Sequence, residues 1–188
     1  VRRCITFARR HDLPLSVRGG GHSVAGHAVR DDAIMLDLSG MKALRVDPET
    51  RTVRAEPGLT LGEFDGATQA FGLATTLGVV SVTGIAGLTL GGGLGWLNGR
   101  HGLACDNLIA ADVATADGQL VRASAQENED LLWGIRGGGG NFGVVTSFEY
   151  RLHPVDLVLA GALSYPLSMA PQVLRFYDAF VKAAPDEL

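Results

Sequence analysis

The order of apolar and polar residues predicts several short helices. At the start of the chain, apolar residues recur at helical spacing at Val1, Cys4, Ile5 and Ala8. Further helices are predicted over residues 60–71, 128–133 and 171–183. Thr60 and Glu63 have the spacing of a capping box at the start of the first of these, and Ser168 is expected to begin the last.

Alternating or continuous apolar runs predict strands over residues 13–17, 34–38, 43–46, 52–56, 108–116, 119–124 and 144–152. Asp117 and Gly118 form a two-residue turn between two of these strands. In the last strand, alternation places Val145, Ser147, Glu149 and Arg151 on one face, and Val144, Thr146, Phe148, Tyr150 and Leu152 on the other. Helices and hairpins are mixed without a regular βαβ rhythm, which indicates the α+β class with mainly antiparallel pairing.

Composition narrows the class of protein. The chain has 188 residues, of which 46% are apolar and 19% charged, with a net charge of −4. The apolar content is typical of one domain with a hydrophobic core, and the negative net charge argues against a surface that binds nucleic acid. No run approaches the roughly 20 apolar residues of a membrane span. Cys4 and Cys105 provide no disulfide framework, so we expect a cytoplasmic protein.

Glycine is the compositional outlier, with 26 of 188 residues against an average of about 7%. The glycines gather in three clusters, Gly19–Gly21, Gly91–Gly95 and Gly137–Gly140. Backbone N–H groups of such segments can approach a ligand closely and form a concave nest for a pyrophosphate without lysines. One cluster alone would indicate only a turn. Three clusters in one compact domain favour a shared nucleotide-like ligand.

The context of two motifs limits the kinds of site. A dinucleotide pattern over residues 138–143 precedes the strand at 144–152, whereas a Rossmann site follows a strand and opens a helix, so we exclude that fold. His22 follows the first glycine cluster, and local spacing alone favours a loop histidine bonded to the backbone. His22 and His27 are five residues apart in a loop without a further ligand cluster, so we expect no metal site.

Four sequence blocks occur in a characteristic order: VRGGGHS at residues 17–23, GIAG and GGGLG at 84–87 and 91–95, HGLACDN at 101–107, and RGGGGNFGVV at 136–145. Together they resemble FAD-linked oxidases with the vanillyl-alcohol-oxidase (PCMH) type of FAD-binding domain, in the berberine-bridge-enzyme-like and 6-hydroxy-nicotine-oxidase-like branch. The resemblance covers nearly the whole chain. It implies an α+β, PCMH-type domain with a mixed or antiparallel sheet flanked by helices.

Family members are much longer than this chain, so the resemblance implies that the chain contains only parts of two domains. Residues 1–154 would form the FAD-binding domain without its first βαβ piece, and residues 155–188 would begin the substrate-binding domain.

The resemblance also implies FAD as cofactor, bonded covalently through His22 to the 8α-methyl carbon of the flavin ring. The glycines before His22 would cradle the pyrophosphate, and Asn107 and Val145 lie in blocks that close around the cofactor. Asn141 and Phe142 would hold the preceding turn. The implied cofactor-binding residues are Arg18, Gly19, Gly20, Gly21, His22, Ser23, Leu77, Gly78, Val82, Thr83, Gly84, Ala86, Gly87, Asn107 and Val145.

The implied activity is that of an FAD-dependent oxidoreductase. It would take a hydride from an alcohol or amine C–H of a small-molecule substrate, with O₂ or another electron acceptor and no nucleic-acid or membrane partner. The catalytic base is not identified, because it would come from the substrate domain. Two alternatives stay open: a truncated FAD-binding module without catalysis, and a family member with non-covalent FAD.

Two departures from the doubly linked members of the family predict a single covalent link. Those members carry a cysteine where this chain has Val80 and a histidine where it has Leu88. Cys105 is expected to be a small buried residue rather than a second link. Outside the site, we expect Trp96 and Trp133 in the core, and His11, His101 and His153 at surface or capping positions.

Overall fold

An antiparallel sheet forms the centre of the molecule. The computed structural model describes residues 1–158 and 160–185. The five strands of this sheet lie in the order β3 (Leu44–Asp47), β4 (Thr52–Ala55), β8 (Val144–Arg151), β6 (Leu108–Ala114) and β7 (Leu120–Ser124). All of its neighbouring strands are antiparallel, and β3–β4 and β6–β7 are hairpins. The predicted α+β class is confirmed.

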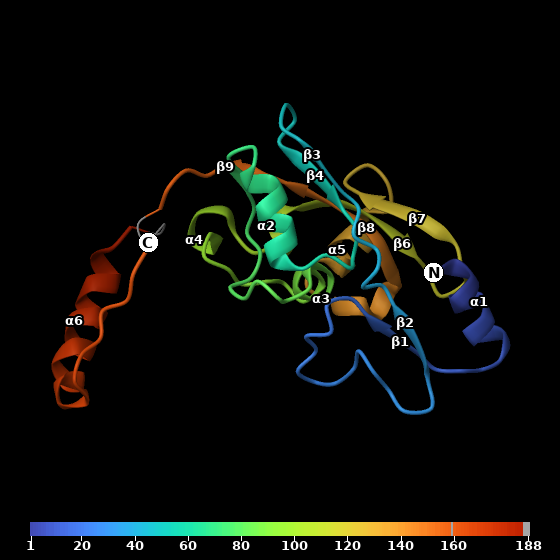
Figure 1. Ribbon diagram of the computed structural model, residues 1–188, viewed down its shortest axis with the longest axis horizontal. Helices are drawn as coiled ribbons and strands as arrows, with labels where there is room; N and C mark the ends of the chain where they lie inside the picture. Colours follow the sequence, from blue (N-terminus) through green and yellow to red (C-terminus); the bar gives the residue numbers. More distant parts are fainter. Residues whose placement is uncertain (159, 186–188) are drawn as a thin grey trace.

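A small parallel pair lies beside this sheet (Figure 1). In it, β1 (Leu15–Arg18) pairs with β2 (Ile34–Asp37), so the long loop between them starts and finishes at opposite ends of the pair. A further short pair joins β5 (Leu73–Ala74) to β9 (His153–Pro154). The fold is therefore mixed, with the parallel pairing restricted to the N-terminal part.

Helices α1 to α5 lie near the central sheet, and a sixth helix follows them in the chain. They are α1 (Arg2–Arg10), α2 (Leu61–Gln69), α3 (Ile85–Leu90), α4 (Asn98–His101), α5 (Glu129–Ile135) and α6 (Ala170–Ala183), with short 3₁₀ turns η1 (Cys105–Asn107), η2 (Gly139–Phe142) and η3 (Leu167–Met169). The helix pattern at the start of the chain, the helix after Thr60 and the helix near residue 130 are confirmed. The short helices α3 and α4 lie in glycine-rich sequence that gives no helical period, and the sequence did not predict them.

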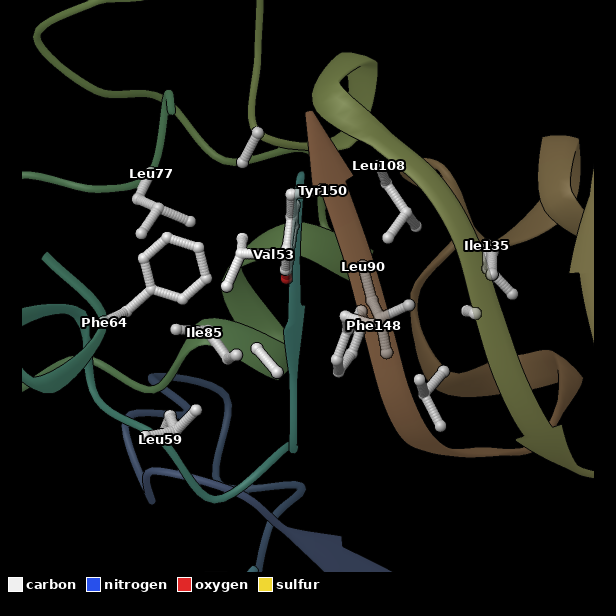
Figure 2. Close-up of a cluster of buried hydrophobic side chains, with 14 of the residues drawn as sticks. Val53, Leu59, Phe64, Leu77, Ile85, Leu90, Leu108, Ile135, Phe148 and Tyr150 are labelled. Atoms are coloured by element: carbon white, nitrogen blue, oxygen red, sulfur yellow. The ribbon is translucent and has the colours of Figure 1, made fainter. Parts of the chain in front are cut away.

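The main core lies between the sheet and the helices α2, α3 and α5. Phe64 from α2 meets Tyr150 from β8 edge to face, with ring centroids 5.5 Å apart. The Tyr150 hydroxyl and the Thr89 hydroxyl are 2.9 Å apart, so this buried polar group has a partner. Figure 2 shows these rings with Ile85 and Leu90 of α3 packed around β8. The segment that carries the second glycine cluster is thus anchored in the core.

The alternation predicted for the last strand is wrong at its start. Asp112 is opposite Ser147, but Val113 is opposite Val145, so a bulge displaces Thr146 from the regular register. As a result, Val145 joins Phe148 in the main core, whereas Val144 packs in a second core with Ile5 of α1. The bulge therefore decides that Val145, and not Val144, shares the main core with Phe148.

Three further expectations are corrected. Trp96 and Trp133 are 85% and 80% exposed and do not belong to the core. Helix α6 begins after Met169 without a side-chain cap, while Ser168 lies inside the preceding turn η3. Trp96 lies in a turn directly after Gly95, and Trp133 faces outward from a short helix, so neither position could be assigned from its apolar character alone.

Helix α6 lies apart from the sheet, at the opposite end of the molecule from α1 (Figure 1). Within the described part of the chain, none of its side chains is buried. No helix among the described residues is both long enough and apolar enough to cross a lipid bilayer.

Candidate functional site

The three glycine-rich regions meet around one cavity of about 820 Å³. The first wall is the loop after β1, over residues 19–23, and the second is the segment 83–91 around α3. The third wall comes from residues 139–145, which include η2 and the start of β8. Leu15 and Val17 of β1, Leu38 and Pro57 complete one side with apolar surface. Segments more than a hundred residues apart in sequence thus form a single concave site.

Most of the residues singled out from the sequence line this cavity. They are Gly19, Gly20, Gly21, His22, Ser23, Thr83, Gly84, Ala86, Gly87 and Val145. The others lie elsewhere, with Leu77 in the main core and Val82 70% exposed outside the cavity. Gly78 packs against Leu61 and Leu88, where an added Cβ would be 2.5 Å from a leucine methyl carbon.

The first two walls touch backbone to backbone. A Cβ added to Gly20 would lie 2.4 Å from the backbone nitrogen of Gly84, and a Cβ on Gly84 would lie 2.5 Å from that of Gly20. No side chain fits between these two chains, so both positions require glycine. The contact brings the His22 loop against the start of α3.

The second wall is held in turn by the start of α2. The amide of Leu61 donates to the Thr83 carbonyl at 2.9 Å, and the amide of Ile85 donates to the Leu59 carbonyl at 3.0 Å. The Glu63 carboxylate accepts from the Thr60 amide at 2.8 Å and forms an ion pair with Lys42, which confirms the predicted capping box. These two donors, with that of Lys42 first, lower the pKa of Glu63 to about 2.

Arg18 lies behind the first wall rather than in the cavity. Its Nη1 donates to Asp37 Oδ2 on the paired strand β2 at 3.0 Å. A Cβ added to Gly21, which has a φ of +71°, would lie 3.1 Å from Arg18 Nε. The Ser39 amide and then Arg18 lower the pKa of Asp37, so the carboxylate stays charged for this pair. Arg18 therefore braces the turn that precedes His22.

Asn107 is buried away from the cavity, where it joins two chain segments. Its Nδ2 donates to the carbonyls of His101 and Leu103, each at 2.9 Å. Its Oδ1 is 2.7 Å from His153 Nε2 and accepts from that ring, since both amide protons are already used. The rings of His101 and His153 stack with centroids 3.8 Å apart.

This stack corrects the expectation for His101 and His153. Both rings are partly buried in one cluster with Asn107, rather than at independent surface or capping positions. Burial is the first cause that lowers the pKa of each imidazole, and the neighbouring cations lower it further. The two histidines are 52 positions apart, so their spacing in sequence gave no signal of the contact.

The third wall is a compact glycine turn. Asn141 Nδ2 donates to the Gly138 carbonyl at 2.9 Å, and the ring of Phe142 packs against Gly134 and Gly138. Arg136 donates from Nε to the Leu108 carbonyl at 3.1 Å and so ties the turn to β6. Asn141 and Phe142 thus hold the turn that leads into Val144 and Val145.

The two cysteines lie in different surroundings. Cys105 is buried, as predicted, and burial raises the pKa of its thiol, while Cys4 is exposed. In the described ranges, no group of three or more histidine, cysteine or acidic side chains is arranged to hold a metal ion.

The cavity has the chemistry of a site for FAD. Its glycine-rich walls expose backbone to the ligand: a Cβ on Gly87 or Gly140 would meet no described atom within 4 Å. Such bare backbone can approach a diphosphate closely, while the apolar side formed by Leu15, Val17 and Leu38 suits aromatic rings. The apolar side was missed in the sequence, although Leu15 and Val17 alternate on one face of a short strand.

Comparisons with known proteins place these features in a family. Residues 1–124 match the family of FAD binding domains. An FAD-linked oxidoreductase of Aspergillus terreus is 47% identical over 164 residues, which cover 87% of this chain and 33% of that protein.

Two solved structures share the fold. The crystal structure of 6-hydroxy-D-nicotine oxidase from Arthrobacter nicotinovorans has a TM-score of 0.80 and 38% identity, over 82% of this chain and 34% of that one. A BBE-like protein of Physcomitrella patens has a TM-score of 0.78 and 32% identity, over 81% and 34%. The chain spans about a third of the length of these proteins. It belongs to the family of FAD-binding domains that is found in FAD-linked oxidoreductases of the 6-hydroxynicotine-oxidase and BBE-like type.

Proposed function

We propose that this chain is the cofactor-binding part of an FAD-dependent oxidoreductase. The observation that carries the proposal is the cavity itself, in which three glycine-rich segments and His22 face one space of about 820 Å³. When bound, FAD would accept a hydride from an alcohol or amine C–H of a small substrate, and O₂ or another acceptor would then take the electrons.

Different segments of the chain bind different parts of FAD. Gly19, Gly20, Gly21 and Ser23 hold the diphosphate through their backbone, braced from behind by Arg18. The segment from Leu77 to Gly87 runs beside the isoalloxazine, with Thr83, Gly84, Ala86 and Gly87 at the cavity surface. Val145 closes the cavity from the third wall, and Asn107 shapes the neighbouring loop from behind.

His22 is the residue that we propose to bond covalently to the flavin ring. It follows Gly21, whose positive φ turns the chain, and it lines the cavity directly. A neutral imidazole nitrogen held close to the 8α-methyl carbon gains reactivity from proximity. The new C–N bond would replace one methyl C–H and one imidazole N–H bond, and O₂ or the other acceptor would take up the two electrons released. Val80 and Leu88 stand where doubly linked proteins carry a cysteine and a histidine, so we propose a single link.

The rest of the proposal concerns the whole protein. We propose that residues 1–154 bind the cofactor and that residues 155–188 begin a substrate domain. We also propose a cytoplasmic location. Residues 159 and 186–188 lie outside the described residues. The base that deprotonates the substrate is assigned to the substrate domain.

Acid precipitation of the intact protein tests the covalent link. We expect a yellow pellet from the unchanged protein and a colourless pellet from His22→Ala, with free FAD in the supernatant. His11→Gln, which removes a histidine at the end of α1, is the matched control and should keep a yellow pellet.

The outcomes separate the alternatives. A colourless pellet from an unchanged yellow protein would indicate non-covalent FAD, and flavin that stays attached to His22→Ala through denaturation would contradict the assignment. Intact protein that binds FAD but never reduces it with any alcohol or amine would favour the binding module without catalysis.

A further inference from the structure

The cavity contains few polar side chains. Among the described residues that line it, these are His22, Ser23, His27, Thr83 and Asn141. None of the described lining residues is a lysine, an arginine, an aspartate or a glutamate. The two histidines are therefore the ionisable side chains that a bound ligand would meet in this part of the chain.

The two histidines cannot serve the same part of the cofactor. FAD carries a diphosphate whose two negative charges persist from acid to alkaline pH. In the proposed function His22 is bonded to the flavin ring, at the other end of the ribityl chain from that diphosphate. Among the described lining residues, His27 is then the remaining side chain that can bring a positive charge into the cavity.

The loop after His22 folds His27 back toward the glycine nest. The amide of Gly26 donates to the Ser23 carbonyl at 3.1 Å, and the amide of Val29 donates to the Gly26 carbonyl at 3.2 Å. Gly26 has a φ of +77°, which reverses the chain between these two turns. His27 lies within the second turn and lines the cavity together with Ser23 and the adjacent Ala28.

The described cavity lining around His27 contains no charged side chain of Lys, Arg, Asp or Glu. On its own loop the nearest charged residues are Arg30, Asp31 and Asp32, all exposed and outside the cavity lining. The walls formed by residues 83–91 and 139–145 present glycine, apolar residues, Thr83 and Asn141. A proton on His27 would therefore be favoured by an anion in the cavity.

We propose that His27 binds the FAD diphosphate as an imidazolium, so that cofactor binding takes up a proton near neutral pH. This inference rests on the proposed function. Imidazole is the ordinary side chain whose charge changes between about pH 5 and 8. A charge-assisted hydrogen bond to a phosphate oxygen is stronger than a neutral one.

The experiment uses the intact protein with His22→Ala, so that FAD binds reversibly. Calorimetric titration with FAD at about pH 5.5 and about pH 8.5, in buffers of different ionisation heat, measures affinity and proton uptake. We expect binding about three- to fivefold tighter at the lower pH, the size of a partly exposed charge pair. We also expect net proton uptake between these values.

Variants assign the effect to one side chain and one part of the ligand. Adding His27→Gln should remove the pH dependence and the proton uptake, whereas His27→Lys should bind tightly at both pH values. His11→Gln is the matched control outside the cavity and should behave like the parent. Riboflavin, which lacks the diphosphate, should bind with an affinity that does not depend on residue 27.

The outcomes decide between the two proposals. Proton uptake that persists in His27→Gln, or a riboflavin affinity that follows the same pH dependence, would overturn the role of His27. FAD binding without any proton uptake overturns this inference alone. Failure of the parent protein to bind FAD at both pH values overturns the proposed function and this inference together.

Discussion

At the scale of single residues, the cavity depends most on the contact between Gly20 and Gly84. The backbones of two loops approach so closely there that a methyl group on either residue would overlap main-chain atoms of the other. Main-chain atoms cannot swing away as a flexible side chain can, so relief requires one wall of the cavity to move. The alignment of His22 with the second wall is therefore fixed by the absence of two side chains.

Gly20→Ala is expected to destabilise the fold and weaken the retention of FAD. The added methyl group overpacks a backbone contact, a change that costs about 1–3 kcal/mol. Denaturant unfolding measures the loss. Gly66→Ala is the matched control, because Gly66 is exposed inside α2 with open space around an added Cβ, and it should gain about 0.5–1 kcal/mol. Equal effects of the two substitutions would contradict this account of the contact.

Residue roles were predictable where a motif carries them. The glycine nest and His22 form one continuous block, and ten of the fifteen expected residues line the cavity. The sequence could not predict that Leu77, Val82 and Asn107 lie outside the cavity, because a motif places a segment near a site without fixing which side chains face it. His27 depends on two loop turns that leave no periodic pattern.

At the scale of elements, the stacked histidines join the end of α4 to β9. Asn107 fixes the geometry by donating to the carbonyls of His101 and Leu103 and accepting from His153. The cluster lies directly after the end of β8, where the chain enters β9. Its polar groups are satisfied only while His153 donates from Nε2.

Acidification is expected to weaken this cluster. The pKa of both imidazoles is lowered in the folded protein, so below about pH 6.5 the unfolded state binds more protons than the folded state. Stability is therefore retained above that pH and is lost as the pH falls through it. Denaturant unfolding at about pH 7.5 and 5.5 measures the change.

A variant isolates this contribution. His101→Gln removes one ring of the stack and should reduce the difference in stability between the two pH values. The carboxylates of Glu63 and Asp37 have lowered pKa values and stay charged in this window. An unchanged pH dependence in His101→Gln would contradict a role for the stack.

The predictability of elements followed the strength of local signals. The capping box at Thr60 and the place of the hairpin turn at Asp117 and Gly118 were visible in sequence, because their chemistry is local. The predicted two-residue length of that turn is wrong: the Thr115 amide donates to the Gln119 carbonyl at 3.0 Å, so the loop has three residues, 116–118. The bulge at Thr146 was not, because it depends on how β8 pairs with β6, whose residues lie far away in the chain. Helices α3 and α4 likewise form through tertiary contacts in sequence rich in glycine.

At the scale of the whole molecule, α6 differs from the preceding part of the chain because it does not pack against the sheet. The amide of Val155 still donates to the Gly72 carbonyl at 3.1 Å, at the edge of the β5–β9 pair. Beyond that point, the described chain runs outward to a helix without a buried side chain (Figure 1). Leu174, Phe176 and Phe180 are all exposed on it.

Ending the chain after Asp156 is expected to leave the rest of the fold intact. Helix α6 adds no buried area to either core, so thermal unfolding monitored at the sheet should keep its midpoint within a few degrees. Circular dichroism should lose helical signal only in proportion to the residues removed. A large fall in the midpoint would show that α6 stabilises the sheet and would contradict the proposed boundary at residue 154.

The distance in sequence between the walls of the cavity has a consequence for the order of events during synthesis. A ribosome that has released the first wall must still add more than a hundred residues before the third wall exists. Because long-range closure comes late, a nascent chain has no enclosed place for a flavin. Loading must therefore wait until residues 139–145 have been made and folded, and a bound flavin then links the beginning of the chain to β8 and protects all three walls against proteolysis.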